Sequence, residues 1–181
     1  MLNFFRANET VYMVMRYERG RTLQQQIQAR PDAISERFLR RTFTHLPNVV
    51  RVLNFFRANE TVYLVMRYEQ GRTLQQDIAR NRGNLRENYI RRVITLMLNG
   101  LREVHTSKLL HLDLKPANVY VRTDDTPVLL DFGLVRGTAL PHDAQGPIGT
   151  TPGYGPPELS RGEPAEPWMD LYSLGVVSLV L

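Results

Sequence analysis

Apolar positions recur along the chain with two different periods, and each period predicts a different kind of element. Between residues 85 and 106 they lie three or four positions apart, which predicts an amphipathic helix. These positions are Ile90, Val93, Ile94, Met97, Leu98, Leu101 and Val104. Residues 61–66 are mostly β-branched or aromatic, which predicts a strand.

Shorter patterns complete the expected element order. A short helix is expected around residues 74–78, after Gly71, and a last helix from about Trp168 to the end. The apolar runs 118–121 and 128–130 are too short for helices. Residues 133–167 are rich in glycine and proline, so we expect a long ordered loop there, and such loops inside compact domains are often functional.

A near-identical repeat occupies the first part of the chain. Residues 2–27 recur as residues 53–78 at a constant offset of 51, with changes only at Met13/Leu64, Arg19/Gln70 and Gln26/Asp77. Each copy predicts a strand ending at 3–6 or 54–57, a turn at 7–9 or 58–60, and a second strand. Stacked repeat proteins usually need three or more units, so two copies favour a recent duplication or an assembly error, without a function of its own.

Charge and composition exclude some classes of protein. The net charge is +5 and the pI about 9.8, but the arginines are scattered, so we expect no nucleic-acid site. The chain has no cysteine, which excludes disulfides and thiolate catalysis and fits a reducing, cytoplasmic location. We expect no secretory signal, and no membrane segment within this chain, because the apolar residues 171–181 are too few to span a bilayer.

Two motifs carry residues suited to phosphoryl transfer. Residues 111–118 read HLDLKPAN, and DFG begins at Asp131, 18 residues after Asp113. The Asp113 carboxylate can orient a hydroxyl and accept its proton, and Lys115 can stabilise charge on a transferred phosphoryl group. Asn118 and Asp131 offer the oxygen ligands that magnesium prefers.

At these motifs the sequence resembles the eukaryotic-like serine/threonine protein kinase family, in its bacterial form, over residues 46–181. The resemblance implies an α+β, protein-kinase-like fold with a mostly helical C-terminal lobe and an incomplete N-terminal lobe. It implies transfer of the ATP γ-phosphate to a serine or threonine of a protein substrate. Asp113 is then the base, Lys115 a catalytic residue that also contacts ATP, and Asn118 and Asp131 bind Mg²⁺ and the nucleotide.

Other segments extend the resemblance. Residues 65–71 resemble the hinge, with Met66 as gatekeeper and the main chains of Arg67 and Glu69 as adenine contacts. Residues 149–158 are similar to the end of an activation segment, in which Thr151 adjoins the substrate site and Glu158 ends the motif.

Two more positions bear on regulation and support of the catalytic loop. Asp170 is expected to anchor the backbone of that loop. Leu112 stands where many kinases have an arginine that binds an activation-segment phosphate, which implies activity not gated by that phosphate.

The first part of the chain departs from the family pattern. A kinase also needs a glycine-rich loop and a lysine on the third strand. Gly20 is the only glycine before Gly71, and no lysine precedes Lys108. We therefore expect residues 1–46 to be a duplicated partial N-lobe and hinge segment, a copy of 52–97, and residues 47–181 to be a partial kinase domain.

The same departures leave alternatives open. The family partner of Glu158 would lie beyond the helix in which the chain stops, so we expect poor stability alone or a longer product. An inactive kinase-like fragment or pseudokinase acting as a binding module is one alternative function. A small-molecule phosphotransferase is another, which Lys115 and the segment 151–158 argue against.

Overall fold

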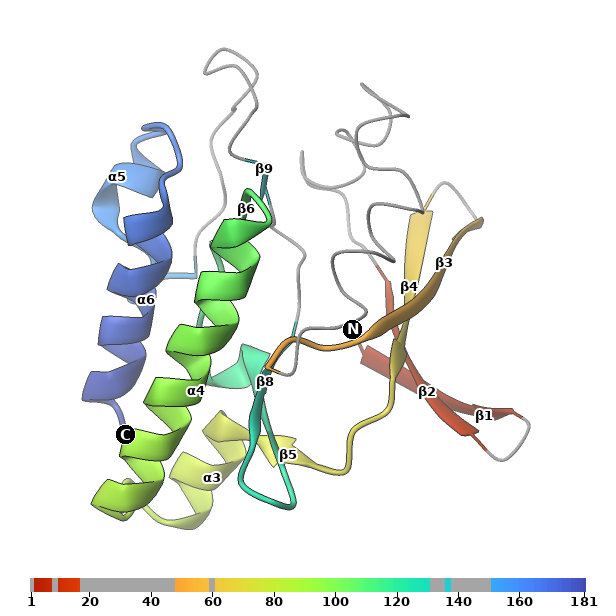
Figure 1. Ribbon diagram of the computed structural model, residues 1–181, viewed down its shortest axis with the longest axis horizontal. Helices are drawn as coiled ribbons and strands as arrows, with labels where there is room; N and C mark the ends of the chain where they lie inside the picture. Colours follow the sequence, from red (N-terminus) through yellow and green to blue (C-terminus); the bar gives the residue numbers. More distant parts are fainter. Residues whose placement is uncertain (1, 8–9, 17–47, 59–60, 131–135, 138–150) are drawn as a thin grey trace.

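The computed structural model describes residues 2–7, 10–16, 48–58, 61–130, 136–137 and 151–181, the strands of the repeat mainly through their backbone. Helices gather on one side and the four strands of the repeat on the other, with a smaller sheet between them (Figure 1). The arrangement is α+β, as the sequence predicts.

The two copies of the repeat form two antiparallel hairpins in one sheet. Strands β1 (Leu2–Ala7) and β2 (Thr10–Arg16) form the first, and β3 (Val52–Ala58) and β4 (Thr61–Arg67) the second. The strand order is β1-β2-β4-β3, so the two hairpins meet along β2 and β4. The hairpins expected from the sequence are confirmed, although β1 and β3 extend into the residues expected as turns.

A second sheet joins the segment after β4 to the segment that follows the HLDLKPAN motif. It contains β5 (Gly71–Thr73), β7 (Val119–Arg122) and β8 (Pro127–Leu129) in that order. A Cβ atom at Gly71 would lie 2.0 Å from the Val121 carbonyl oxygen, so β5 can approach β7 this closely only with glycine here. The two short apolar runs of the sequence are thus strands.

Three helices form the scaffold of the other half. Helix α3 (Leu74–Arg80) begins at a capping box, in which Thr73 and Gln76 satisfy each other's backbone N–H groups. Helix α4 (Glu87–Thr106) matches the predicted amphipathic helix, and α6 (Pro167–Leu179) matches the last one. Most of the apolar positions that predicted α4 are buried or half-buried, whereas Leu98 is 44% exposed.

The expected long loop at 133–167 contains more regular structure than the sequence predicts. The strand β9 (Arg136–Gly137) pairs with β6 (Leu109–Leu110), and α5 (Pro157–Ser160) is a short helix begun by two prolines. Both elements are too short to give a periodic pattern. Only the pairing with β6 defines β9, because a two-residue strand has no signal of its own.

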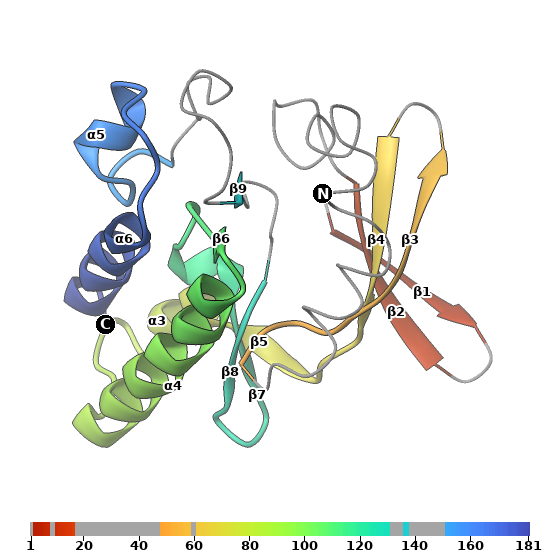
Figure 2. The ribbon, with the colours of Figure 1, turned by 45° about the horizontal axis from the view of Figure 1, so that its top comes forward.

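The main core lies between α4, α6 and the sheet of β7 and β8. Its fully buried side chains include Met97 and Leu101 of α4 and Leu129 of β8. At Gly100 a Cβ atom would lie 3.3 Å from the Leu129 side chain, so the helix packs tightly on the strand. Figure 2 shows α4 beside α6 from a second direction. This packing fixes the position of the segment that follows α4.

The segment 48–50 connects the hairpin sheet to this core. The Val50 N–H donates to the Leu129 carbonyl (3.0 Å), and the Leu129 N–H donates to the Asn48 carbonyl (2.9 Å). The Asn48 side chain also donates to the Pro127 carbonyl (3.0 Å). These bonds hold the start of β3 against β8.

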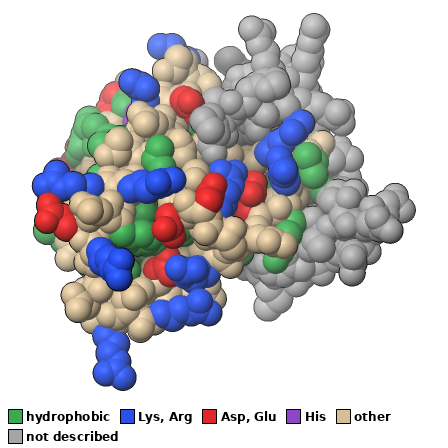
Figure 3. Space-filling model, turned by 60° about the horizontal axis from the view of Figure 1, so that its bottom comes forward, with side chains coloured by type: hydrophobic (Ala, Val, Ile, Leu, Met, Phe, Trp, Pro, Cys, Tyr) green, Lys and Arg blue, Asp and Glu red, His purple; other side chains and the backbone are tan. Residues whose placement is uncertain are grey.

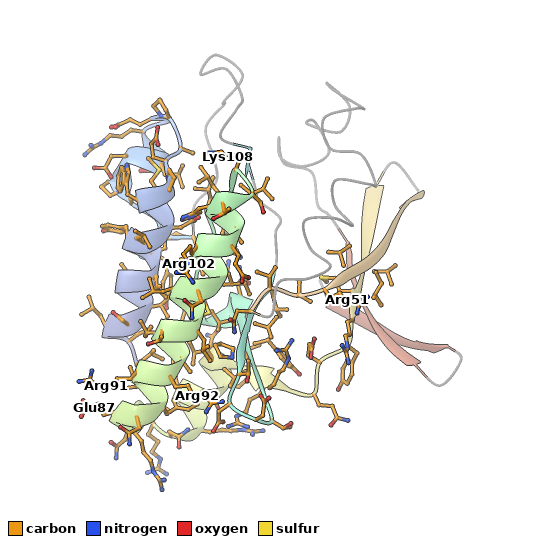
Figure 4. The ribbon with its side chains drawn as sticks, viewed as in Figure 1. Arg51, Glu87, Arg91, Arg92, Arg102 and Lys108 are labelled. Atoms are coloured by element: carbon orange, nitrogen blue, oxygen red, sulfur yellow. The ribbon has the colours of Figure 1, made fainter. Side chains whose placement is uncertain are left out.

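Charged side chains are spread over the described surface. Lys and Arg side chains are interspersed with Asp and Glu on the face in Figure 3. In Figure 4, Arg91, Arg92 and Arg102 lie along α4, whereas Arg51 lies beside the hairpin sheet. None of the described helices is both long enough and apolar enough to cross a membrane.

Candidate active site

The side chains of the HLDLKPAN motif converge on one carboxylate. Lys115 Nζ lies 2.8 Å from Asp113 Oδ2, and the Thr151 hydroxyl donates to Asp113 Oδ1 at 2.6 Å. Lys115 also donates to the Thr151 hydroxyl oxygen at 2.7 Å. The three side chains form a closed ring of bonds. The Thr151 hydroxyl is therefore held between the carboxylate of Asp113 and the ammonium group of Lys115.

Asn118 completes the group around Asp113. Its amide nitrogen donates to the Asp113 carbonyl (2.9 Å) and to Oδ2 (2.8 Å). The 3-10 turn η1 (Pro116–Asn118) places the amide there, and Pro116 is suited to its first position because it has no N–H to satisfy. With three side chains donating to its two oxygens, the Asp113 carboxylate is fixed in orientation.

The same geometry leaves an oxygen of Asn118 for a cation. Its Oδ1 takes no part in the bonds to Asp113, and magnesium prefers oxygen ligands. Asn118 therefore fits a magnesium ligand. Asp131, the other expected ligand, lies outside the described residues. Within the described part of the chain, no three or more His, Asp or Glu side chains gather into a metal cluster.

The imidazole of His111 is a buried support for this loop. Its Nε2 lies 2.9 Å from the Leu130 carbonyl oxygen, and the Asp113 N–H donates to its Nδ1 at 3.4 Å. A carbonyl can only accept and an N–H can only donate, so His111 donates from Nε2 to Leu130 and accepts at Nδ1 from Asp113. It connects Asp113 to Leu130, which directly precedes Asp131.

Asp170 of α6 holds the backbone of the same loop, as expected from the sequence. Its carboxylate is fully buried and accepts from the N–H groups of Leu112 (2.7 Å) and His111 (2.9 Å). Leu112 has φ of 64°, a left-handed conformation that is unfavourable for a leucine. The bonds to Asp170 offset that strain and fix the backbone directly before Asp113.

The segment 67–70, expected as the hinge, is held at both ends by backbone hydrogen bonds. The Arg67 N–H donates to the Arg51 carbonyl (2.9 Å), and the Gln70 carbonyl accepts from the Thr123 N–H (3.1 Å). Between them, the Glu69 carboxylate forms a two-pronged ion pair with Arg122 of β7, at 2.8 and 3.0 Å. Met66 is fully buried beside this segment. The main chains of Arg67 and Glu69 are thus held in place, as adenine contacts would require.

Of the nine residues expected at the site, the fold brings four together in one cluster. Asp113, Lys115, Asn118 and Thr151 form one cluster, whereas Met66, Arg67 and Glu69 belong to the hinge. Glu158 is half-buried on α5 and forms no ion pair with another described residue.

Sequence reasoning missed two residues that support the site. His105 Nε2 of α4 lies 2.8 Å from Asp170 Oδ2, and Arg122 holds Glu69. His105 and Asp170 are 65 residues apart in the chain, and Arg122 and Glu69 are 53 residues apart. No local sequence pattern therefore connects the partners. The one available signal was a histidine at the end of the predicted helix, close to the HLDLKPAN motif.

Comparison with known proteins indicates the same class of protein as the residues of the candidate site. The family model for the protein kinase domain matches residues 30–181. The chain belongs to the protein kinase domain family. The kinase fold expected from the sequence is thereby confirmed for most of the chain.

Individual relatives agree, bacterial ones included. Serine/threonine-protein kinase B of Synechocystis sp. is 35% identical over 75% of this chain, which covers 25% of that protein. Serine/threonine-protein kinase PknA of Nostoc sp. is 37% identical over 70% of the chain and 23% of its own length. Cell division control protein 2 homolog 3 of Trypanosoma brucei brucei is 31% identical over 74% of this chain, which covers 43% of that protein. The chain thus spans about a quarter of the two bacterial relatives.

Proposed function

We propose that the protein transfers the γ-phosphate of ATP to a serine or threonine hydroxyl of a protein substrate. The ring formed by Asp113, Lys115 and Thr151 supports this most strongly, because it holds a hydroxyl between a base and a cation. Asp113 orients the acceptor hydroxyl and takes its proton, and Lys115 stabilises negative charge on the transferred group. The names of the relatives support serine or threonine as the acceptor.

Magnesium and the nucleotide belong to the same proposal. Asn118 Oδ1 and the Asp131 carboxylate would hold Mg²⁺, which neutralises charge on the phosphates when bound. Met66 and the main chains of Arg67 and Glu69 would contact the adenine, and Lys115 and Asn118 the phosphate end. The ion pair between Glu69 and Arg122 supports the hinge by keeping it in one conformation.

Location and organisation stay proposals. We expect the protein to act in the cytoplasm without a nucleic-acid partner, in agreement with the absence of cysteine and the dispersed charges. We expect residues 1–46 to be the duplicated segment and residues 47–181 the kinase part. Thr151 and Glu158 would belong to the activation segment beside the protein substrate.

A transfer assay with the whole chain tests the function. The chain is incubated with radiolabelled ATP, Mg²⁺ and a mixed protein substrate, and labelled phosphoserine and phosphothreonine are measured. Asp113→Asn keeps the shape of the side chain but removes the base, so we expect transfer to fall at least about a hundredfold. Asp125→Asn is the matched control on the exposed surface and should leave the rate unchanged.

Equal loss in both variants would show that the effect is not specific to Asp113, and the mechanism would then be wrong. Full activity of Asp113→Asn would contradict it as well. Each variant's folded state is checked by circular dichroism before the comparison.

A binding module without transfer is the second candidate. The absence of lysine before Lys108, and of a second glycine before Gly71, favours it, since both groups normally hold the phosphates. Calorimetric titration with Mg²⁺ and a non-hydrolysable ATP analogue distinguishes the two. Binding with no measurable transfer by the unmodified chain would favour the module.

A further inference from the structure

The two hairpins of the repeat are paired with an internal two-fold symmetry. In the register of β2 with β4, Tyr12 lies opposite Arg67 and Arg16 opposite Tyr63. Tyr12 and Tyr63 are the same position of the repeat, as are Arg16 and Arg67, since the offset is 51. Exchanging the copies therefore reproduces the same pairs.

The centre of this symmetry lies between Val14 and Val65, which are equivalent residues that pair with each other. Within each hairpin the pairing is also equivalent, from Asn3 opposite Val14 to Ala7 opposite Thr10, and from Asn54 opposite Val65 to Ala58 opposite Thr61. The one departure is an irregularity between Val52 and Asn54. Figures 1 and 2 show the two hairpins meeting along β2 and β4.

A pairing of this kind is isologous, which means that the same strand edge serves on both sides. Isologous contacts are the ones that form two-fold dimers between identical molecules. The edge of β4 accepts a strand with the sequence of the repeat, and nothing in the pairing requires that strand to come from the same chain. The charges agree, because each arginine lies opposite a tyrosine and no like charges face each other across the strands.

The length of chain between the hairpins also permits exchange. Thirty-one residues separate Arg16 from Asn48, where the chain is bonded to β8, and a chain of that length can span more than one sheet when extended. An unpaired β4 edge would be a template for adding another strand.

We propose that the edge of β4 is a docking surface for the β1–β2 hairpin of a second copy of this chain, so that the protein forms homodimers by exchanging hairpins. The exchanged dimer keeps every strand pair of the monomer. Its stability relative to two monomers is set mainly by concentration.

Cysteine cross-linking of the whole chain tests the proposal, because the natural sequence has no cysteine. One chain carries Val14→Cys and a second, mass-labelled chain carries Val65→Cys. They are unfolded together, refolded over a range of concentrations and oxidised, and the disulfides between chains are measured by mass spectrometry. Met13→Cys with Met66→Cys is run in parallel, because neighbouring antiparallel pairs alternate between wider and closer spacing.

We expect a mixed disulfide in one of these two combinations, and the ratio of dimer to monomer should rise about tenfold for each tenfold rise in free monomer. Thr10→Cys mixed with Val65→Cys is the matched control, since Thr10 lies opposite Ala7 and not Val65. It should give no product above background.

The double variants Val14→Cys/Val65→Cys and Met13→Cys/Met66→Cys, each in a single dilute chain, establish the register. Formation of an internal disulfide without any mixed disulfide at high concentration would overturn the proposal. Absence of the internal disulfide from both would overturn it too, because the pairing itself would then be wrong.

Discussion

The two copies of the repeat form equivalent hairpins, but they differ in polar residues near and just beyond their ends. Near the end of the second copy, the buried carboxylate of Asp77 accepts from the Arg72 guanidinium and from the hydroxyl of Tyr89 (2.5 Å), which lies beyond the repeat. These bonds connect β5, α3 and α4. Fifty-one residues before Asp77 and Tyr89 stand Gln26, which has no charge, and Phe38, which has no hydroxyl.

This comparison separates two kinds of structural information. Strand pairing depends on backbone hydrogen bonds and a pattern of apolar residues, so a duplicated sequence reproduces it. The cluster of Arg72, Asp77 and Tyr89 depends on particular atoms, so two substitutions remove the chemistry on which it rests. The second copy is therefore the one whose sequence can connect the hinge to the catalytic half.

The largest loss of stability is expected at Asp170. This residue lies outside the repeat and provides a reference for the effects of substitutions within it. Asp170→Ala removes the acceptor for the buried N–H groups of His111 and Leu112. The free energy of unfolding should fall by about 3–5 kcal/mol, as measured by denaturant titration. Ser173→Ala, on the same helix, should cost much less because its hydroxyl bonds only within the helix. Equal losses would contradict the anchoring role.

Asp77→Gln gives the second copy the residue of the first. The variant removes the charge that accepts from Arg72 and Tyr89, so the free energy of unfolding should fall by about 2–3 kcal/mol. Asp125→Asn provides the control, since Asp125 is exposed. If Asp77→Gln is as stable as the natural chain, the difference between the copies has no structural importance.

Tyr89→Phe makes the other change and should lower the free energy of unfolding by about 1 kcal/mol at neutral pH. Burial, followed by the bond to Asp77, raises the pKa of the Tyr89 phenol well above its ordinary value. An unfolded tyrosine ionises above about pH 10, whereas folded Tyr89 keeps its proton. The free energy of unfolding should therefore decline as the pH rises past that point.

The variant should show a shallower decline, because it lacks the group whose folded-state pKa is raised. Denaturant titrations of both chains at neutral and alkaline pH make the comparison. Parallel pH profiles for the two chains would show that Tyr89 is not the group responsible.

The smallest effect is expected at Gln70, which is Arg19 in the first copy. Gln70 is exposed and its recorded bond uses the backbone carbonyl, which accepts from Thr123. Gln70→Arg should change the free energy of unfolding by less than about 0.5 kcal/mol. A thermal melt that shifted as far as that of Asp77→Gln would show that the copies differ in more than the buried cluster.

Long or repeated patterns could be predicted from the sequence. Helix α4 carries its apolar residues over 20 positions, and each hairpin appears twice, so both were assigned correctly. The exposure of Leu98 did not follow from the pattern, because a three- or four-residue period fixes the centre of an apolar face better than its margin. Strand β9 and helix α5 are too short for any period, and they depend on packing against other segments.

The candidate site shows the same division. The order and spacing of Asp113, Lys115, Asn118 and Asp131 were enough to indicate phosphoryl transfer, because each residue type suits one part of that chemistry. The supports from His105 and Arg122 could not be predicted, because their partners lie far away in the chain.

The sequence by itself therefore determined the family and the existence of two equivalent hairpins, since both depend on local order and spacing. The tertiary structure alone decided how those parts meet. It placed β2 on the edge of β4 and Asp170 beneath the HLDLKPAN loop. It also brought Thr151 to Asp113. These contacts join residues distant in the chain, and their geometry depends on the packing of the whole fold.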